Sequence, residues 1–469
     1  RPVTSVIRTG QGDLELLAAR DYRHDSAYGV YTVGNALPAG EVPDVARPDG
    51  GELGASYAEY QDSEAVTDVQ AGFLTGGGEV LVQAGRNLHG YTSGDLNGDL
   101  PASDWLWTQG AAADGALDAW WIHPGTYSKN STSRAKFSTF QGIGALGGGN
   151  LSVSAGEQLG TYAFIGADAT PVGALNLVVG ASGWRDADGT VRQTGGGELR
   201  VSAGAINPLR DGTRSNVANL RGDIRVRAGA IGQTWQTFQV PGSNSDPRPD
   251  DLITRARVNA YGLLSVTQGD GAARLLSVGD AVFQTLNPTA GLPGAGLWTD
   301  RTKTSVFAAG GDITLSTTGI EAPSTLSLVA SEGSIYGTSN SGDSIQVRPS
   351  LDGGVEVLAA DSIYRLGLGV EAHEDAKGVS GLAPTRFYAV DGDIYNLGYG
   401  ALPSTGSSGL LGRPAWIRAG RDIVGLGQTI DSAFNGQHSR AVAFGHNADT
   451  DVSLIEAGRD LIYVDAAAV

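Results

Sequence analysis

Three segments of this chain of 469 residues have closely similar sequences. These copies of one repeat are GGGEVLVQAG at 76–85, GGGNLSVSAG at 147–156 and GGGELRVSAG at 195–204. Between the glycines and the closing Ala-Gly, apolar and polar residues alternate, and this period of two is typical of a strand with one buried and one exposed face. The flanking glycines favour tight corners, because glycine reaches positive φ without steric cost. The chain is therefore constrained to fold as an array of similar short strands.

Degenerate copies of the phrase continue down the chain. They read RGDIRVRAG at 221–229, GGDITLSTTG at 310–319, AWIRAGRDIVG at 415–425 and SLIEAGRDLIY at 453–463. The Ala-Gly corners at Gly204 and Gly229 are 25 residues apart, whereas the preceding intervals, from Gly85 to Gly156 and on to Gly204, are 71 and 48. We interpret these intervals as one, three and two coils of about two dozen residues, which is typical of a solenoid.

The predicted fold is all-β, a parallel β-helix (β-solenoid) with loop excursions. Stacked coils would bury their apolar residues in columns, and about 15 to 18 coils would fit the chain length. The alternative is a β-sandwich or a propeller, but a propeller blade needs about 40 residues with four strands.

Charge and composition exclude several classes of partner. The formal net charge is −18, so the chain repels nucleic acid and anionic lipid, and neither is expected to bind. Cysteine is absent, which excludes disulfides and thiolate metal sites. We find no run of about 18 apolar residues, so no membrane span is expected, and we predict no cofactor.

The GGGxLxVxAG and AGRDI phrases resemble those of the filamentous haemagglutinin family, which are very long exoproteins of two-partner secretion systems in Gram-negative bacteria. The resemblance spans about residues 71–465. It implies a right-handed parallel β-helix, secretion to the bacterial cell surface through an outer-membrane transporter, and adhesion to a glycan or protein of a host or neighbouring cell. Signatures of the family's Asn-Pro-Asn-Gly type do not occur in the sequence, so the resemblance implies an interior or carboxy-terminal fragment.

The domain organisation follows from where the repeat fades. Residues 1–70 show it poorly and are expected to form early coils with an irregular loop excursion. Residues 71–469 are expected to form the β-helix, interrupted by a tryptophan-rich insertion at 91–140 that leaves it.

Candidate binding residues lie in that insertion. It holds Trp105, Trp107, Trp120 and Trp121, half of the eight tryptophans, and such rings could stack on sugars. The alternative is a small satellite core that fastens the insertion to the rest of the fold.

Two further motifs have an obvious functional interpretation. Asp95, Asn97 and Asp99 have the spacing of a calcium loop, although its glycine and its final acidic residue are missing, so the calcium prediction is weak. The tripeptide 221–223 spells Arg-Gly-Asp, an integrin-recognition sequence, but it also occupies the corner before a strand. No catalytic residue or other metal site is predicted.

The predicted function is a structural and adhesive rod of a secreted surface protein, not an enzyme. Two alternatives remain open: a stalk for a toxin or a self-assembling filament, which requires end-to-end stacking, and a polysaccharide-acting β-helix enzyme, which requires clustered carboxylates on one face.

Overall fold

The computed structural model describes most of the chain, and its residues are grouped into two compact units. Unit 1 comprises 1–227, 264–274 and 285–302, and unit 2 comprises 228–263, 275–284 and 303–469. The described residues are 6–24, 28–38, 41, 73–90, 106–109, 117–122, 127–131, 134–138, 140–161, 174–208, 214–238, 256–286, 297–315, 321–337, 345–348, 350–370, 381–399, 413–426, 444–446 and 448–462. These residues are all β, with no helix, and most of their strands belong to a large, mostly parallel sheet, which confirms the predicted fold class at this level.

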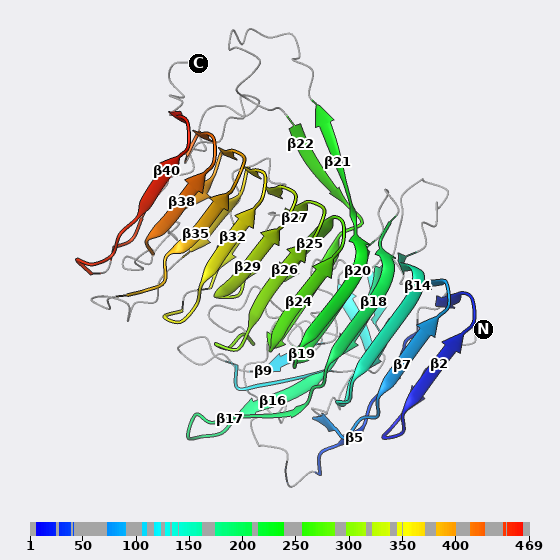
Figure 1. Ribbon diagram of the computed structural model, residues 1–469. Helices are drawn as coiled ribbons and strands as arrows, with labels where there is room; N and C mark the ends of the chain where they lie inside the picture. Colours follow the sequence, from blue (N-terminus) through cyan, green and yellow to red (C-terminus); the bar gives the residue numbers. More distant parts are fainter. Residues whose placement is uncertain are drawn as a thin grey trace. The chain divides into compact units, whose positions relative to one another are not determined.

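Unit 1 contains three sets of parallel strands, which we call its ladders. The first ladder, labelled in Figure 1, contains β2 (Leu14–Ala18), β7 (Val80–Ala84), β14 (Leu151–Thr161) and β18 (Leu199–Ile206). The second contains β3 (Tyr22–His24), β8 (Asn87–Gly90) and the end of β14. The third contains β1 (Ile7–Thr9), β4 (Val30–Thr32), β13 (Ile143–Ala145), β15 (Ala174–Val179), β19 (Arg214–Arg221) and β23 (Leu264–Asp270).

Unit 2 also contains three ladders, and the chain visits them in a constant order. The first contains β26 (Lys303–Ala308), β29 (Thr325–Ala330), β32 (Val355–Ala359), β35 (Thr385–Ala389), β38 (Ala415–Ala419) and β40 (Leu454–Ala457). The second contains β27 (Ile313–Leu315), β30 (Ile335–Gly337), β33 (Ile363–Tyr364), β36 (Ile394–Tyr395), β39 (Ile423–Val424) and β41 (Leu461–Ile462). The third contains β28 (Glu321–Ala322), β31 (Ile345–Val347), β34 (Gly367–Val370) and β37 (Gly398–Tyr399).

The predicted alternation places apolar side chains in buried columns. In the first ladder of unit 2, one column contains Val306, Leu328, Val357, Phe387 and Ile417, each paired in register with the next and each no more than 1% exposed. Burying a side chain of this size contributes about 1.5–3 kcal/mol relative to leaving it exposed. The columns are therefore the main source of cohesion between neighbouring strands.

The number of residues between two copies of the repeat does not give the number of coils between them. Glu79 bonds to Asn150, 71 residues on, and Asn150 bonds to Glu198, 48 residues on, so these strand starts are immediate neighbours. In unit 2 the same step takes only 22 residues, from Asp312 to Ser334. The interpretation of 71 and 48 residues as three and two coils is therefore wrong, and the expected number of coils is too high.

The extra residues include excursions that form antiparallel pairs of their own. They pair β9 (Leu106–Gln109) with β10 (Ala119–Ile122), β11 (Tyr127–Ser131) with β12 (Arg134–Ser138), β16 (Ala181–Arg185) with β17 (Val191–Gly195), β21 (Gln233–Phe238) with β22 (Ala256–Tyr261) and β5 (Asn35–Ala36) with β6 (Leu74–Thr75). β20 (Ile224–Ile231) pairs in parallel with β25 (Ala281–Leu286), and β24 (Ala272–Ser277) belongs to the same sheet. Within residues 1–70, the described strands β1 to β4 pair in parallel with strands of unit 1, as Leu14 does with Val80.

A row of polar side chains, the corner ladder, joins neighbouring turns of unit 2. The side chain of Asp280 accepts a hydrogen bond from the backbone N–H of Asp312 (2.9 Å), and Asp312 accepts one from Ser334 (2.8 Å). Further along, Asp393 accepts the backbone N–H of Asp422 at 2.8 Å. Because a buried N–H without an acceptor is costly, these side chains complete the backbone bonding where the chain turns.

Candidate functional site

The tryptophans predicted to bind ligand lie in the core of unit 1 wherever the structure describes their side chains. Trp120 is 5% exposed and Trp121 is 2% exposed, both on β10. The side chains of Trp105 and Trp107 lie outside the described residues. A buried ring offers no face to a sugar, so the ligand prediction has no exposed ring to support it at Trp120 or Trp121.

These rings pack as the satellite-core alternative requires. Phe73 contacts Trp121 and Trp184, with ring centroids 5.9 and 5.2 Å apart. Trp120 lies in a buried cluster with Phe140 and other apolar residues of unit 1. The aromatic side chains therefore stabilise the antiparallel excursion by packing.

The predicted calcium ligands Asp95, Asn97 and Asp99 lie outside the described residues, so the calcium prediction stays a prediction. Within the described ranges, no group of three or more histidine, aspartate or glutamate side chains is arranged to hold a metal ion.

The Arg-Gly-Asp tripeptide forms the corner that precedes β20. The guanidinium of Arg221 donates to the backbone carbonyl of Gln193 at 3.1 Å, and the carboxylate of Asp223 accepts the backbone N–H of Ala272 at 3.1 Å. Gly222 has a φ of 119°, a conformation that favours glycine. Each residue of the tripeptide thus has a role in the corner.

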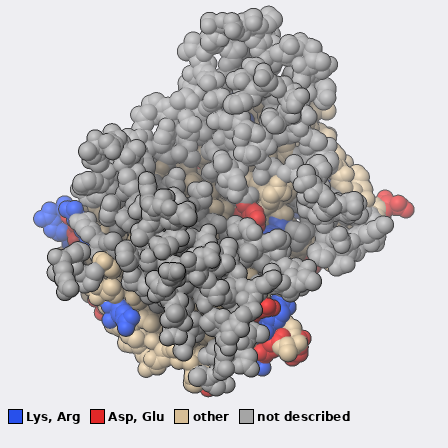
Figure 2. Space-filling view, turned by 180° about the vertical axis from the view of Figure 1, so that it is seen from behind, with Lys and Arg blue, Asp and Glu red and all other residues tan. Residues whose placement is uncertain are grey.

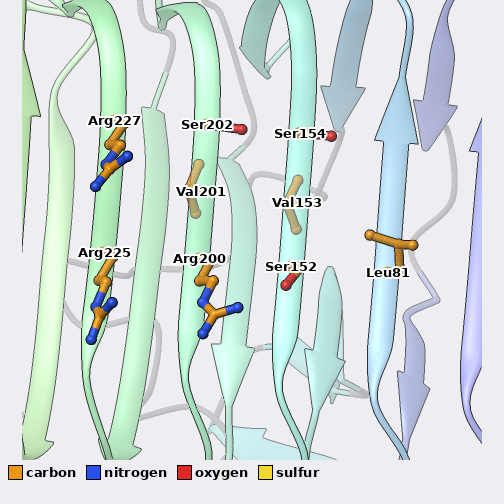
Figure 3. A pocket seen from close by; sticks show the side chains of 9 residues that line it. All are labelled: Leu81, Ser152, Val153, Ser154, Arg200, Val201, Ser202, Arg225 and Arg227. Carbon is orange, nitrogen blue, oxygen red and sulfur yellow. The ribbon is translucent and has the colours of Figure 1, made fainter.

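The outward face of the first ladder in unit 1 carries two rows of side chains that run across the strands. Strand register places these residues in the rows: Glu15, Leu81, Ser152 and Arg200 in one, and Leu17, Gln83, Ser154 and Ser202 in the other. Figure 3 shows that β20 continues both rows, with Arg225 beside Arg200 and Arg227 beside Ser202. We call Ser152, Ser154, Arg200, Ser202, Arg225 and Arg227 the arginine–serine face. They border a shallow hollow of about 380 Å³.

Two of these arginines share a carboxylate at one end of the face. Glu198 forms ion pairs with Arg200 and with Arg225, the latter at 2.7 Å between Nε and Oε1. The hydrogen bond to Glu198 raises the pKa of the Arg200 guanidinium. The side chains of Arg200 and Arg225 nevertheless remain 57% and 47% exposed, so water screens both ion pairs. Both cations can therefore turn toward a ligand at little cost.

The other end of the face has a cation and hydroxyl groups. Arg227 is exposed, and it has no ion pair among the described residues. The hydroxyls of Ser202 and Ser154 lie in the same row, on the two neighbouring strands (Figure 3). A guanidinium binds a planar carboxylate through two parallel hydrogen bonds, and a serine hydroxyl can both donate and accept. This end of the face is suited to an anion that also carries hydroxyl groups.

In the opposite view of Figure 2, the basic and acidic side chains of the described residues stand in small groups, several of them blue beside red. On the arginine–serine face, three arginines gather on the neighbouring strands β18 and β20.

In unit 2, the carboxylates of the corner ladder are engaged within the fold. Asp393 is 5% exposed and accepts hydrogen bonds from the backbone of Asp422, from Arg421 at 2.9 Å and from the hydroxyl of Tyr395 at 3.2 Å. Burial raises the pKa of the Asp312 carboxyl; the hydrogen bond from the Ser334 N–H opposes the rise, whereas neighbouring carboxylates add to it. We therefore assign these groups to the architecture of the fold.

A column of tyrosines lies beside the corner ladder. Tyr336, Tyr364 and Tyr395 stack with ring centroids 5.0 and 5.2 Å apart and nearly parallel planes. Burial raises the pKa of Tyr336 and of Tyr395 to about 12, so both keep their hydroxyl protons at neutral pH. Since each ring covers the next, the column stabilises the stack of strands.

The sequence contains a signal for the arginine–serine face, although none of its recognisable motifs includes it. Arg200, Arg225 and Arg227 occupy polar positions of two neighbouring copies of the repeat, LRVSAG and IRVRAG. Finding that they gather requires the order of strands in space, which the spacing of the copies did not give.

Comparison of the chain with known protein families, with curated proteins and with solved structures finds no match. Within the described part of the chain, no helix has the length and apolar character needed to cross a membrane.

Proposed function

We propose that the chain is a right-handed parallel β-helix and serves as the structural and adhesive rod of a secreted bacterial surface protein of filamentous haemagglutinin type. The observation that carries the proposal is the order of the ladders in unit 2. The chain passes from the first ladder to the second and third and then returns to the first, beside the strand it left one turn earlier. A β-helix produces this order, because each winding contributes one strand to each face.

A rod of this kind suits adhesion because different residues of each strand stabilise the fold and contact a ligand. The inward residues of each strand form columns, and the outward residues are free to differ from strand to strand. In unit 1 the outward residues include the arginine–serine face, which a surface glycan or protein could contact. In this proposal the chain carries out no catalysis, reaches the cell surface through an outer-membrane transporter and is displayed outside the cell.

The adhesive role can be tested with the purified full chain on a glycan array and on intact bacterial and host cells. We expect saturable binding to at least one class of glycan, or to a cell surface from which it can be removed by added glycan or by protease. Absence of binding to every glycan and every cell type would overturn the adhesive role, and a plain spacer would then be the better description.

The winding can be tested separately by disulfide trapping. Cysteines introduced at Leu81 and Ser152, which pair in register on β7 and β14, should cross-link on oxidation. The chain has no natural cysteine, so the readout is free of background. Failure of this pair to cross-link, in a variant that melts like the parent, would refute the stacked order.

A further inference from the structure

We propose that the arginine–serine face binds a linear polysaccharide whose sugar residues carry carboxylate groups. This inference rests on the adhesive role proposed above and names the ligand of that role. It is carried by the position of Arg225 and Arg227 on β20, beside the serine-bearing strands β18 and β14 (Figure 3).

Charge on the face favours an anion even though the chain as a whole is acidic. Arg200, Arg225 and Arg227 supply three positive charges, which Glu79, Glu198 and Asp223 offset at the Arg200 and Arg225 end of the face. The Debye length is about 8 Å at physiological ionic strength, so most of the 50 acidic residues are screened from a ligand bound here. The positive charge that these carboxylates do not offset therefore lies at the Arg227 end of the face.

The direction of the rows favours a polymer. Neighbouring strands of a sheet lie about 4.8 Å apart. The side chains of Ser154, Ser202 and Arg227 therefore repeat across the strands at an interval similar to the length of one sugar residue in an extended glycan. A chain lying along the row can place successive sugars over successive strands, with hydroxyls on the serines and a carboxylate on Arg227.

The residues around the hollow favour a carboxylated glycan over other polymers. Apart from the arginines and serines, its lining consists of Leu81 and of Val153 and Val201, whose side chains are buried, and it has no aromatic ring. A neutral glycan is usually held by stacking on an aromatic face, and a single-stranded nucleic acid by stacking of its bases. The planar guanidinium groups instead match carboxylates, which they bind through paired hydrogen bonds.

The test measures binding of the full chain to immobilised polygalacturonate, with neutral dextran and dextran sulfate as comparison polymers. The informative variant is Arg225→Gln/Arg227→Gln, which removes two charges from exposed positions. The matched control is Arg418→Gln, which removes an exposed outward arginine on β38 of unit 2, where it pairs with Glu456 at 2.9 Å. Melting temperatures of all variants should match that of the parent chain.

We expect the parent chain and Arg418→Gln to bind polygalacturonate with equal affinity and the double variant to bind it at least tenfold more weakly. None of the three proteins should bind dextran. Equal binding by the double variant and the parent would overturn the inference. Tighter binding to dextran sulfate than to polygalacturonate would also overturn it, because charge density alone would then explain the affinity.

The two proposals can fail separately. A chain that binds another glycan on the array but not polygalacturonate would refute the carboxylated ligand and leave the adhesive role in place. A chain that binds no polymer, glycan or cell would refute both.

Discussion

Removing the carboxylate of Asp393 should destabilise unit 2 because the corner ladder depends on it. Asp393 is buried and accepts the backbone N–H of Asp422 at 2.8 Å, a guanidinium N–H of Arg421 at 2.9 Å and the hydroxyl of Tyr395 at 3.2 Å. In Asp393→Ala, the backbone N–H of Asp422 loses its acceptor, which costs about 1–3 kcal/mol in a buried setting. The ion pair adds at most about 1 kcal/mol, since the Arg421 side chain is 46% exposed. We therefore expect a loss of about 1–4 kcal/mol.

The assay combines urea denaturation of the full chain with hydrogen exchange at the amide of Asp422. Asp393→Asn retains an oxygen that can accept the same N–H, so it should lose only about 1 kcal/mol. Asp391→Ala removes the same charge from an exposed position two residues earlier and should change the stability by less than about 0.5 kcal/mol.

Either of two results would refute this reasoning. One is unchanged exchange protection of the Asp422 amide in Asp393→Ala. The other is an Asp393→Asn variant as unstable as Asp393→Ala, which would mean that the charge and not the hydrogen bond to the backbone matters.

Three further predictions concern the columns and the corners. Phe387→Ala should lose about 3–5 kcal/mol in urea denaturation, because the ring is fully buried in its column, whereas Tyr388→Ala on the opposite face should lose clearly less; equal losses would contradict the alternation. Asp312→Asn should be more stable than the parent at pH 7. The Asp312 pKa is raised in the folded state, so the free energy of unfolding of the parent falls as the pH rises above 3.8, the ordinary pKa of aspartate, whereas asparagine does not titrate; in a pH series the advantage should vanish below pH 3.8. Gly222→Ala should lose more than about 1 kcal/mol, because φ is 119° and an added Cβ would lie 2.0 Å from the backbone oxygen of Gly197; a normal melting temperature would contradict the strained corner.

The strand content and the burial pattern could be predicted from local pattern alone. The alternation in LSVSAG placed Val153 inward, and the structure pairs it with Val82 and Val201 in a buried column. The number of coils could not be predicted in this way, because the interval between two copies adds the length of the excursion to the length of the coil. Nothing local to Gly85 or Gly156 reveals that the two corners belong to adjacent strands.

The candidate site was harder to predict because it is assembled across strands. Trp120 and Trp121 were predicted to bind ligand because they cluster in the sequence, but large aromatic rings more often pack in a core than bind a ligand. Arg200 and Arg227 are separated in sequence by a corner and a strand of another ladder, so their proximity depends on tertiary pairing. Such a site is indicated when the polar positions of neighbouring repeats are aligned and carry side chains of one kind.

The unequal length of the turns has a consequence for how such a chain can change over time. Neighbouring strands of the described ladders are joined by as few as 22 residues, from Asp312 to Ser334, and by as many as 113, from Val30 on β4 to Ile143 on β13. By loop-closure entropy that difference costs only about 1–2 kcal/mol. Insertions between strands therefore leave the scaffold nearly untouched, so new segments can be acquired, or grafted by the experimenter, at the excursions while the stacked strands keep their partners.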